Sequence, residues 1–115
     1  MARDYAGRVP QLRLALAQLN PVVGDIDANL DLLLASARQA HAAGANVLIT
    51  PEMAVTGYPI EDLAYRLAFI RRSQWAVQEF ATRLAAEGLG ELVVIVGHLD
   101  QATDVPDRLG LPKNA

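Results

Sequence analysis

Apolar residues recur at two different periods along the chain, and these periods predict alternating strands and helices. Between residues 12 and 17, leucines alternate with arginine or alanine, the period expected of a strand with one face more firmly buried than the other. Residues 47–49 and 92–96 are short uninterrupted apolar runs, and the valine-rich second run is typical of a strand covered on both faces. The pattern therefore predicts three strands.

The segments between these strands have the helical period. Leucines and alanines between residues 30 and 40 form one apolar stripe, and either Asp25 or Asp27 is placed to cap the first turn of this helix. Gly44 supplies the left-handed residue that ends it. A second apolar stripe follows the acidic residues Glu61 and Asp62 and continues to about residue 88. The pattern leaves open whether this stretch is one bent helix or two.

The order of these elements predicts an α/β fold with parallel strands. Residues 1–10 have no periodicity and are expected to be flexible, whereas residues 100–113 contain turn-forming prolines and glycines and are expected to form an irregular loop. An α/β domain that has made three strands and two or three helices normally continues into another strand. We therefore interpret residues 1–115 as the amino-terminal portion of a domain.

Composition narrows the class of protein. A chain of 115 residues with 52% hydrophobic and 20% charged residues is expected to form an ordered domain. The net charge of −3 and the absence of a basic run argue against a nucleic-acid partner. No apolar segment approaches the roughly 20 residues that cross a bilayer, so a cytoplasmic protein without a membrane partner is expected. The sequence has no cysteine, which excludes a disulfide or a thiol nucleophile within these residues.

Candidate chemistry lies directly after the strand at 47–49. Thr50 and Pro51 stop that strand immediately before Glu52, which places the carboxylate at the strand's carboxyl end, where ligands bind in open α/β sheets. The turn that follows is expected to hold the hydroxyl of Tyr58 over the same edge. Glu52 is therefore a candidate acid or base, although a solvated loop carboxylate or a helix cap has the same local pattern. Tyr58 is alternatively an aromatic residue packed on the domain edge, and His98, which follows the third strand, is interpreted as structural.

Several motifs, in order, resemble the opening of the nitrilase, or carbon-nitrogen hydrolase, superfamily. They are AQLNP at 17–21, VGD at 23–25, AGA at 43–45, PE at 51–52 and TGYP at 56–59. The continuation EDL at 61–63, with Arg66 and Phe69, is similar to the amino-terminal glutaminase domain of glutamine-dependent NAD synthetases. The resemblance runs from about residue 12 to residue 98. It implies the front part of an αββα sandwich, with three strands and two to three helices in this chain.

The resemblance implies amide hydrolysis by a triad of glutamate, lysine and cysteine. It assigns the catalytic glutamate to Glu52 and the lining of a glutamine pocket to Tyr58. A thiol with a pKa of about 8.5 is mostly protonated at neutral pH, so the glutamate takes its proton as the sulfur attacks the amide carbon, and the lysine stabilises the oxyanion. The ammonia is then expected to pass to a carboxyl-terminal synthetase domain that uses ATP and magnesium. A homo-oligomer is also implied.

The chain departs from this pattern in two of the three triad residues. It contains no cysteine, and Lys113 precedes the position at which the resemblance places the lysine. These residues alone are therefore expected to be inactive and to hold no cofactor. Two other interpretations stay open: a stand-alone amidase of the same superfamily, and a non-catalytic truncated module that pairs with another chain. Because half a sandwich exposes an apolar sheet face and a strand edge, the isolated chain is expected to associate.

Overall fold

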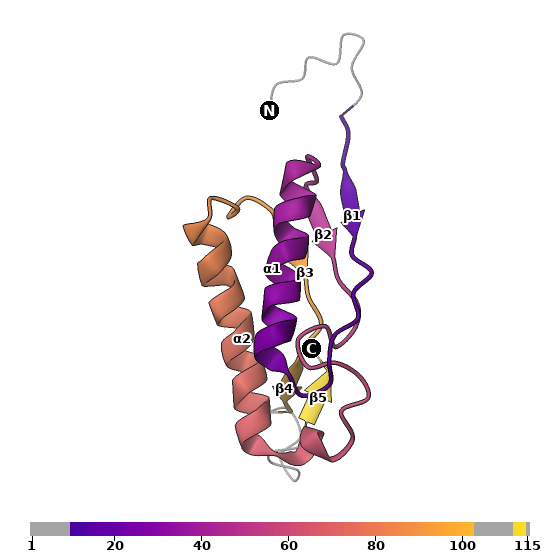
Figure 1. The fold of residues 1–115 in the computed structure, drawn as a ribbon, viewed down its shortest axis with the longest axis vertical. Coiled ribbons are helices and arrows are strands. Elements are labelled where there is room, and N and C mark those ends of the chain that lie inside the picture. The colour runs from indigo at the N-terminus through magenta and orange to yellow at the C-terminus, as the bar shows by residue number, and fades with distance from the viewer. Residues whose placement is uncertain (1–9, 103–111, 115) are drawn as a thin grey trace.

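Two helices lie side by side over one face of a three-stranded parallel sheet (Figure 1). The computed structural model describes residues 10–102 and 112–114. The sheet has the order β1-β2-β3, formed by Leu14–Leu16, Val47–Ile49 and Val93–Ile95. Along the chain, helix α1 (Ile26–Ala42) connects β1 to β2, and helix α2 (Leu67–Ala86) belongs to the connection from β2 to β3. The predicted α/β fold, with these three strands, is confirmed.

The three strands are aligned without stagger. Leu14 is opposite Val47, which in turn is opposite Val93, and the same alignment continues to the last residue of each strand. The segments that leave the strands after Leu16, Ile49 and Ile95 therefore all begin at one edge of the sheet. This edge is where the residues with candidate chemistry are expected to meet.

The ends of α1 follow the residues that the sequence singled out. Of the two candidate aspartates, Asp25 is the cap, because its Oδ1 accepts a hydrogen bond of 3.1 Å from the backbone N–H of Ala28. Gly44 has a φ of 79° and donates its N–H to the carbonyl of His41 at 2.9 Å, which ends the helix as predicted.

The second helical stretch is two helices. Glu61–Tyr65 is a 3₁₀ helix, η1, and α2 begins at Leu67. Arg66 separates them, because its φ of −93° and ψ of 111° are extended. The question that the sequence pattern left open is thereby answered, and Glu61 and Asp62 do lie in the first turn of η1.

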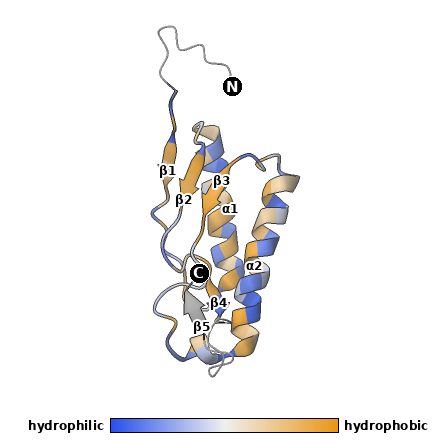
Figure 2. Ribbon diagram, turned by 180° about the vertical axis from the view of Figure 1, so that it is seen from behind, coloured by the Kyte–Doolittle hydropathy of each residue, from blue (hydrophilic) through white to orange (hydrophobic). Residues whose placement is uncertain are grey.

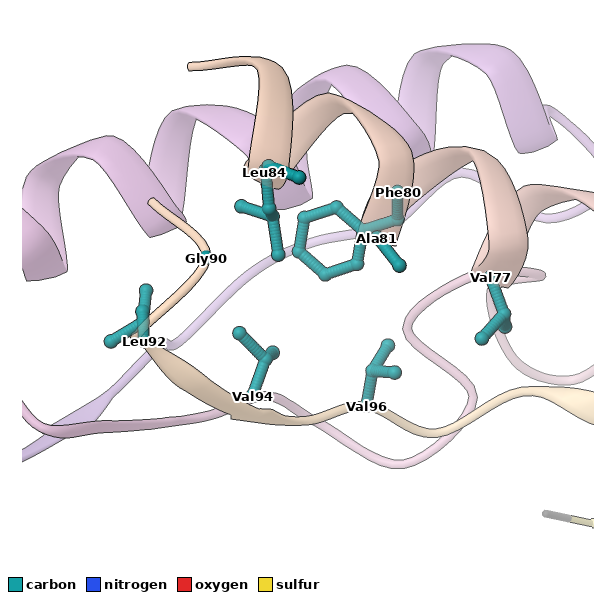
Figure 3. Close-up of a pocket in the computed structure, with 9 residues that line it drawn as sticks. Val77, Phe80, Ala81, Leu84, Gly90, Leu92, Val94 and Val96 are labelled. Atoms are coloured by element: carbon teal, nitrogen blue, oxygen red, sulfur yellow. The ribbon is translucent and has the colours of Figure 1, made fainter. Parts of the chain in front are cut away.

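The core lies between the helices and the sheet. Leu33 of α1 and Leu48 of β2 are at most 1% exposed. Figure 3 shows Phe80 of α2 pointing toward the β3 segment, from which Val94 and Val96 project upward. From β1, Ala15 contributes to the same core. The helix-facing side of the sheet is therefore the buried side.

The opposite face of the sheet is exposed and apolar. Leu14, Leu16, Val93 and Ile95 are 51%, 73%, 58% and 56% exposed, and Figure 2 shows the hydrophobic strands on the side away from the helices. The prediction that the strand at 92–96 is covered on both faces is therefore wrong within the described residues. In the first strand the alternation is real, but Ala15 is the half-buried residue, and Leu14 and Leu16 face outward.

A short hairpin follows the sheet. Strand β4 (Leu99–Gln101) pairs with β5 (Pro112–Asn114) in antiparallel orientation. The prediction of an irregular loop over 100–113 is therefore wrong at both of its ends, and the count of three strands is two short for the described residues. Residues 103–111, like residues 1–9 for which flexibility was predicted, lie outside the described part.

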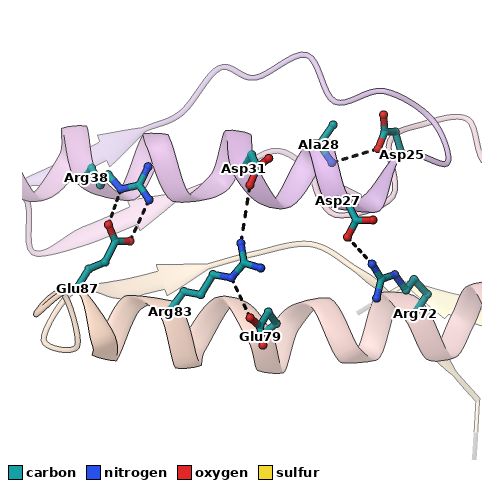
Figure 4. Close-up of polar contacts among 9 residues, drawn as sticks. All are labelled: Asp25, Asp27, Ala28, Asp31, Arg38, Arg72, Glu79, Arg83 and Glu87. Atoms are coloured by element: carbon teal, nitrogen blue, oxygen red, sulfur yellow. Dashed lines mark hydrogen bonds and ion pairs between the residues drawn. The ribbon is translucent and has the colours of Figure 1, made fainter.

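Ion pairs connect α1 and the α2 segment on their outer side (Figure 4). They join Arg38 to Glu87, Arg72 to Asp27, and Arg83 to Asp31. The hydrogen bond from Arg38, 2.7 Å long, lowers the pKa of the Glu87 carboxyl below its ordinary value, and the same bond raises the pKa of Arg38. Exposed pairs of this kind contribute little individually, so the packing of the helices rests mainly on their apolar faces.

Candidate active site

Glu52 lies where the sequence places it, at the carboxyl end of β2. Thr50, the residue after the strand, donates both its backbone N–H (3.0 Å) and its Oγ1–H (3.1 Å) to the carbonyl of Ile95. The chain leaving β2 is therefore still bound to β3 two residues before Glu52. Glu52 itself is exposed. Glu52 thus lies at the edge at which the three strands end.

Glu52 begins a tight turn that is otherwise buried. The four residues after it, 53–56, are at most 5% exposed. Within the turn, the carbonyl of Met53 accepts from the N–H groups of Thr56 (3.2 Å) and Gly57 (2.8 Å). Met53 has a φ of 57°, a left-handed conformation that side-chain-bearing residues adopt at an energetic cost. The surrounding chain therefore has to hold this turn in place.

Gly97, two residues beyond the end of β3, holds one side of the turn. A Cβ on Gly97 would lie 2.6 Å from the backbone nitrogen of Met53 and 3.1 Å from the Cα of Glu52. Its carbonyl also accepts a 3.2 Å hydrogen bond from the N–H of Val55. Only glycine permits so close an approach of the two backbones. The exit of β3 is thereby packed directly against the candidate catalytic residue.

Asn29 of α1 holds the other side. It is fully buried and hydrogen-bonds both to Val22 and to the carbonyl of Val55 in the turn. Sequence reasoning missed Asn29 and Gly97. Asn29 had a detectable signal, because it is a polar residue on the apolar stripe of α1, where an amide is expected only if it has buried partners. Gly97 gave no comparable signal, since its role depends on a contact distant in sequence.

Tyr58 and His98 differ in exposure. Tyr58 follows the turn, is 75% exposed and precedes a cis peptide bond to Pro59. It is therefore not packed on the domain edge within the described residues. His98 is half-buried, with Nδ1 at 3.2 Å from the carbonyl of Leu99, and the N–H of Leu99 donates to the buried Ser73. These bonds fit a structural role for the segment at 98–99.

Within residues 10–102 and 112–114, no three side chains of histidine, aspartate or glutamate gather in a way that suits a metal ion. Within the same ranges, neither helix is both long enough and apolar enough to cross a membrane.

Two helices packed on one face of a parallel sheet agree with the family that the sequence matches. Residues 13–105 match the carbon-nitrogen hydrolase family, and the chain belongs to that family. Among curated proteins, it is 36% identical over 104 residues to the glutamine-dependent NAD(+) synthetase of Thermotoga maritima, covering 90% of this chain and 18% of the relative. It is 41% identical over 71 residues to the Synechocystis sp. protein of the same name, covering 62% of this chain and 13% of that one.

Solved structures agree with this assignment. The glutamine-dependent NAD+ synthetase of Acinetobacter baumannii, in complex with adenosine diphosphate, superposes with a TM-score of 0.65 at 32% identity over 81% of this chain and 16% of that chain. An amidase from Nesterenkonia sp. shares the fold, with a TM-score of 0.57 at 24% identity over 90% of this chain and 38% of that chain. The predicted resemblance is confirmed. The chain spans less than a fifth of the length of the curated relatives described above.

Proposed function

We propose that these residues form the front part of a glutaminase domain, which hydrolyses the side-chain amide of glutamine and supplies ammonia for ATP-dependent NAD synthesis. The observation that carries the proposal is the position of Glu52, on a buried turn at the carboxyl end of β2, in a chain 36% identical to a glutamine-dependent NAD synthetase over 104 residues. In this proposal Glu52 is the general base of the reaction.

Glu52 serves the reaction in both of its halves. Its carboxylate first accepts the proton of a cysteine thiol as the sulfur attacks the amide carbon of glutamine. That proton then passes to the departing nitrogen, so that ammonia leaves and a thioester remains. In the second half, Glu52 takes a proton from the water that attacks the thioester, and returns it to the sulfur as glutamate is released. Because Glu52 is exposed, an incoming thiol can reach its carboxylate.

Other parts of the natural protein supply the remaining groups. The 115 residues have no cysteine, so the nucleophile comes from outside them, and so does the lysine that stabilises the oxyanion. Tyr58, with its ring mostly exposed beside the Glu52 turn, is proposed to line the glutamine pocket. ATP and magnesium belong to the proposed synthetase part. On their own, these 115 residues are proposed to be inactive.

The test uses the natural protein that contains these residues and compares Glu52→Gln with Glu91→Gln. Glu91 is an exposed glutamate at the opposite, amino end of β3, which makes it the matched control. General-base catalysis contributes about 10²–10⁴-fold, so Glu52→Gln is expected to lower glutamine hydrolysis by at least about 100-fold. Glu91→Gln is expected to leave it unchanged. When ammonium replaces glutamine, the Glu52 variant is expected to form NAD at the wild-type rate.

Each alternative gives a different result in this assay. If Glu52→Gln keeps its glutaminase activity, Glu52 is not the base and the proposal is wrong. If the natural protein hydrolyses amides but forms no NAD with either nitrogen source, it is a stand-alone amidase. If it hydrolyses no amide and is recovered only with another chain, the interaction module is the better interpretation.

A further inference from the structure

We infer that Asn29 is a positioning residue for the Glu52 turn: its buried side-chain amide fixes the turn against α1, so that the carboxylate is held in its reactive place. Asn29 does not approach the reacting atoms itself and acts through the backbone of residues 53–57. The inference rests on the proposed function, because a positioning role has a catalytic effect only if Glu52 takes part in the reaction.

Both polar atoms of the Asn29 side-chain amide form hydrogen bonds. Its Oδ1 accepts from the N–H of Val22 at 2.8 Å, and its Nδ2 donates to the carbonyl of Val22 at 2.8 Å and to that of Val55 at 3.0 Å. Asn29 is 0% exposed and its bond to the Val55 carbonyl is buried, whereas its two bonds to Val22, a residue that is 56% exposed, are partly buried. One residue on a helix thereby joins two separate loops, the segment that follows β1 and the turn that begins at Glu52.

Only an amide has the required pattern of one acceptor and two donors at this size. An aspartate of the same shape would place an oxygen against the carbonyl oxygens of Val22 and Val55. An alanine would leave the buried Val55 carbonyl without this partner, which is costly, and would also remove the partly buried hydrogen bonds to Val22. Substitution therefore weakens the connection between the loops rather than only removing bulk.

The two loops also contact each other directly, so a displacement of one loop is expected to shift the other. The N–H of Gly24 donates to the carbonyl of Thr56 at 2.9 Å. Gly57 lies so close to the other loop that a Cβ on it would be 2.7 Å from the Cα of Val23. On the far side, Gly97 packs against the backbone of Glu52 and Met53. The turn is thus held between the exit of β3 and the loop that Asn29 anchors.

The turn depends on this support because Met53 has a left-handed backbone, with a φ of 57°. Such a conformation persists only where the surroundings impose it. When the anchor on the α1 side is removed, the turn is expected to relax, and Glu52, the next residue, moves with it. A displacement of about 1 Å from the reactive geometry lowers the rate of an enzyme by about 100-fold.

The test measures glutamine hydrolysis by the natural protein carrying Asn29→Asp, with Asn29→Ser as a milder second variant. Leu33→Ala is the control for stability, because Leu33 lies one turn further along α1, is 0% exposed and packs into the core. All assays are run well below the melting temperature of every variant. The expected result is a 10- to 100-fold loss of kcat for Asn29→Asp with KM within threefold. Leu33→Ala is expected to lose melting temperature but to keep kcat.

A pH profile adds a result that a purely structural role does not give. A protonated aspartate regains one donor, so the kcat of Asn29→Asp relative to wild type is expected to rise as the pH is lowered. A folded Asn29 variant with wild-type kcat overturns the inference, as does an equal loss of kcat in Leu33→Ala. If neither Asn29 variant folds, Asn29 is a requirement of the fold and the inference is wrong. Activity retained by Glu52→Gln would instead refute the proposed function.

Discussion

Replacing Gly97 by alanine tests how the Glu52 turn is held from the side of β3. The added Cβ would lie 2.6 Å from the nitrogen of Met53, about 0.8 Å nearer than ordinary van der Waals contact begins, at 3.4 Å. It would also lie 3.1 Å and 3.2 Å from the Cα and carbonyl carbon of Glu52. These are backbone atoms, so no side-chain rotation relieves the contact. Either the turn or the exit of β3 has to move.

The magnitude follows from the cost of inserting a methyl group into packed structure, about 1–3 kcal/mol. Because the neighbours are backbone, the loss for Gly97→Ala is expected in the upper part of that range, at about 2–3 kcal/mol. Gly90→Ala is the matched control. Its Cβ would meet nothing closer than the Cα of Ala85 at 3.9 Å, and neither glycine has a left-handed φ. Gly90→Ala is expected to be neutral or stabilising by about 0.4–1 kcal/mol.

The measurement is urea unfolding of the natural protein and its two alanine variants, together with kcat for glutamine hydrolysis. Gly97→Ala is expected to lose stability and, because the Glu52 turn shifts, to lose kcat by about 10- to 100-fold. Gly90→Ala is expected to keep both. If the two variants have the same free energy of unfolding and the same kcat, the close approach of β3 to the turn is not a constraint, and the reasoning is refuted.

Three further predictions concern the fold. Asp25→Ala is expected to cost about 0.5–2 kcal/mol in urea unfolding, because the N–H of Ala28 loses its cap. The hydrogen bond from Arg38 lowers the pKa of Glu87, so the stabilisation from this ion pair is present above the ordinary glutamate pKa near 4.3 and is lost as the pH falls through the lower folded-state pKa. The free energies of unfolding of Glu87→Gln and wild type are therefore expected to converge as the pH is lowered through this range. Leu16→Lys is expected to reduce self-association of the isolated 115 residues, measured by light scattering. If the variant associates as strongly as wild type, the exposed apolar face is not the cause of the association.

Local features of the fold were predictable because neighbouring residues determine them. The apolar run at 47–49 is β2, Asp25 is a helix cap, and Gly44 ends α1. The position of Glu52 follows in the same way, since the residues that stop β2 are adjacent to it. In each case the residues that determine the feature lie within a few positions of it in the sequence.

Features that depend on distant partners were not predictable from the pattern. The hairpin of β4 and β5 pairs Leu99 with Asn114, across a stretch of turn-forming residues that resembles a loop. Gly97 matters only because Met53, far away in sequence, lies against it. Asn29 has partners in two loops, and neither can be identified from its own helix. The candidate base was therefore visible in the sequence, whereas the residues that hold it were not.

The distribution of large and small side chains on β1 explains why the alternation did not reveal which face is buried. Ala15 faces the helices, where a small side chain lets a helix pack close to the sheet, and the larger Leu14 and Leu16 point to the exposed face. Burying a leucine side chain stabilises a protein by about 1.5–3 kcal/mol. We therefore expect another part of the folded protein to pack against the face that carries the larger apolar residues. Val93 and Ile95 extend the same face across the sheet. This distribution supports the proposal that these residues are the front part of an αββα sandwich, in which a second sheet covers the exposed face.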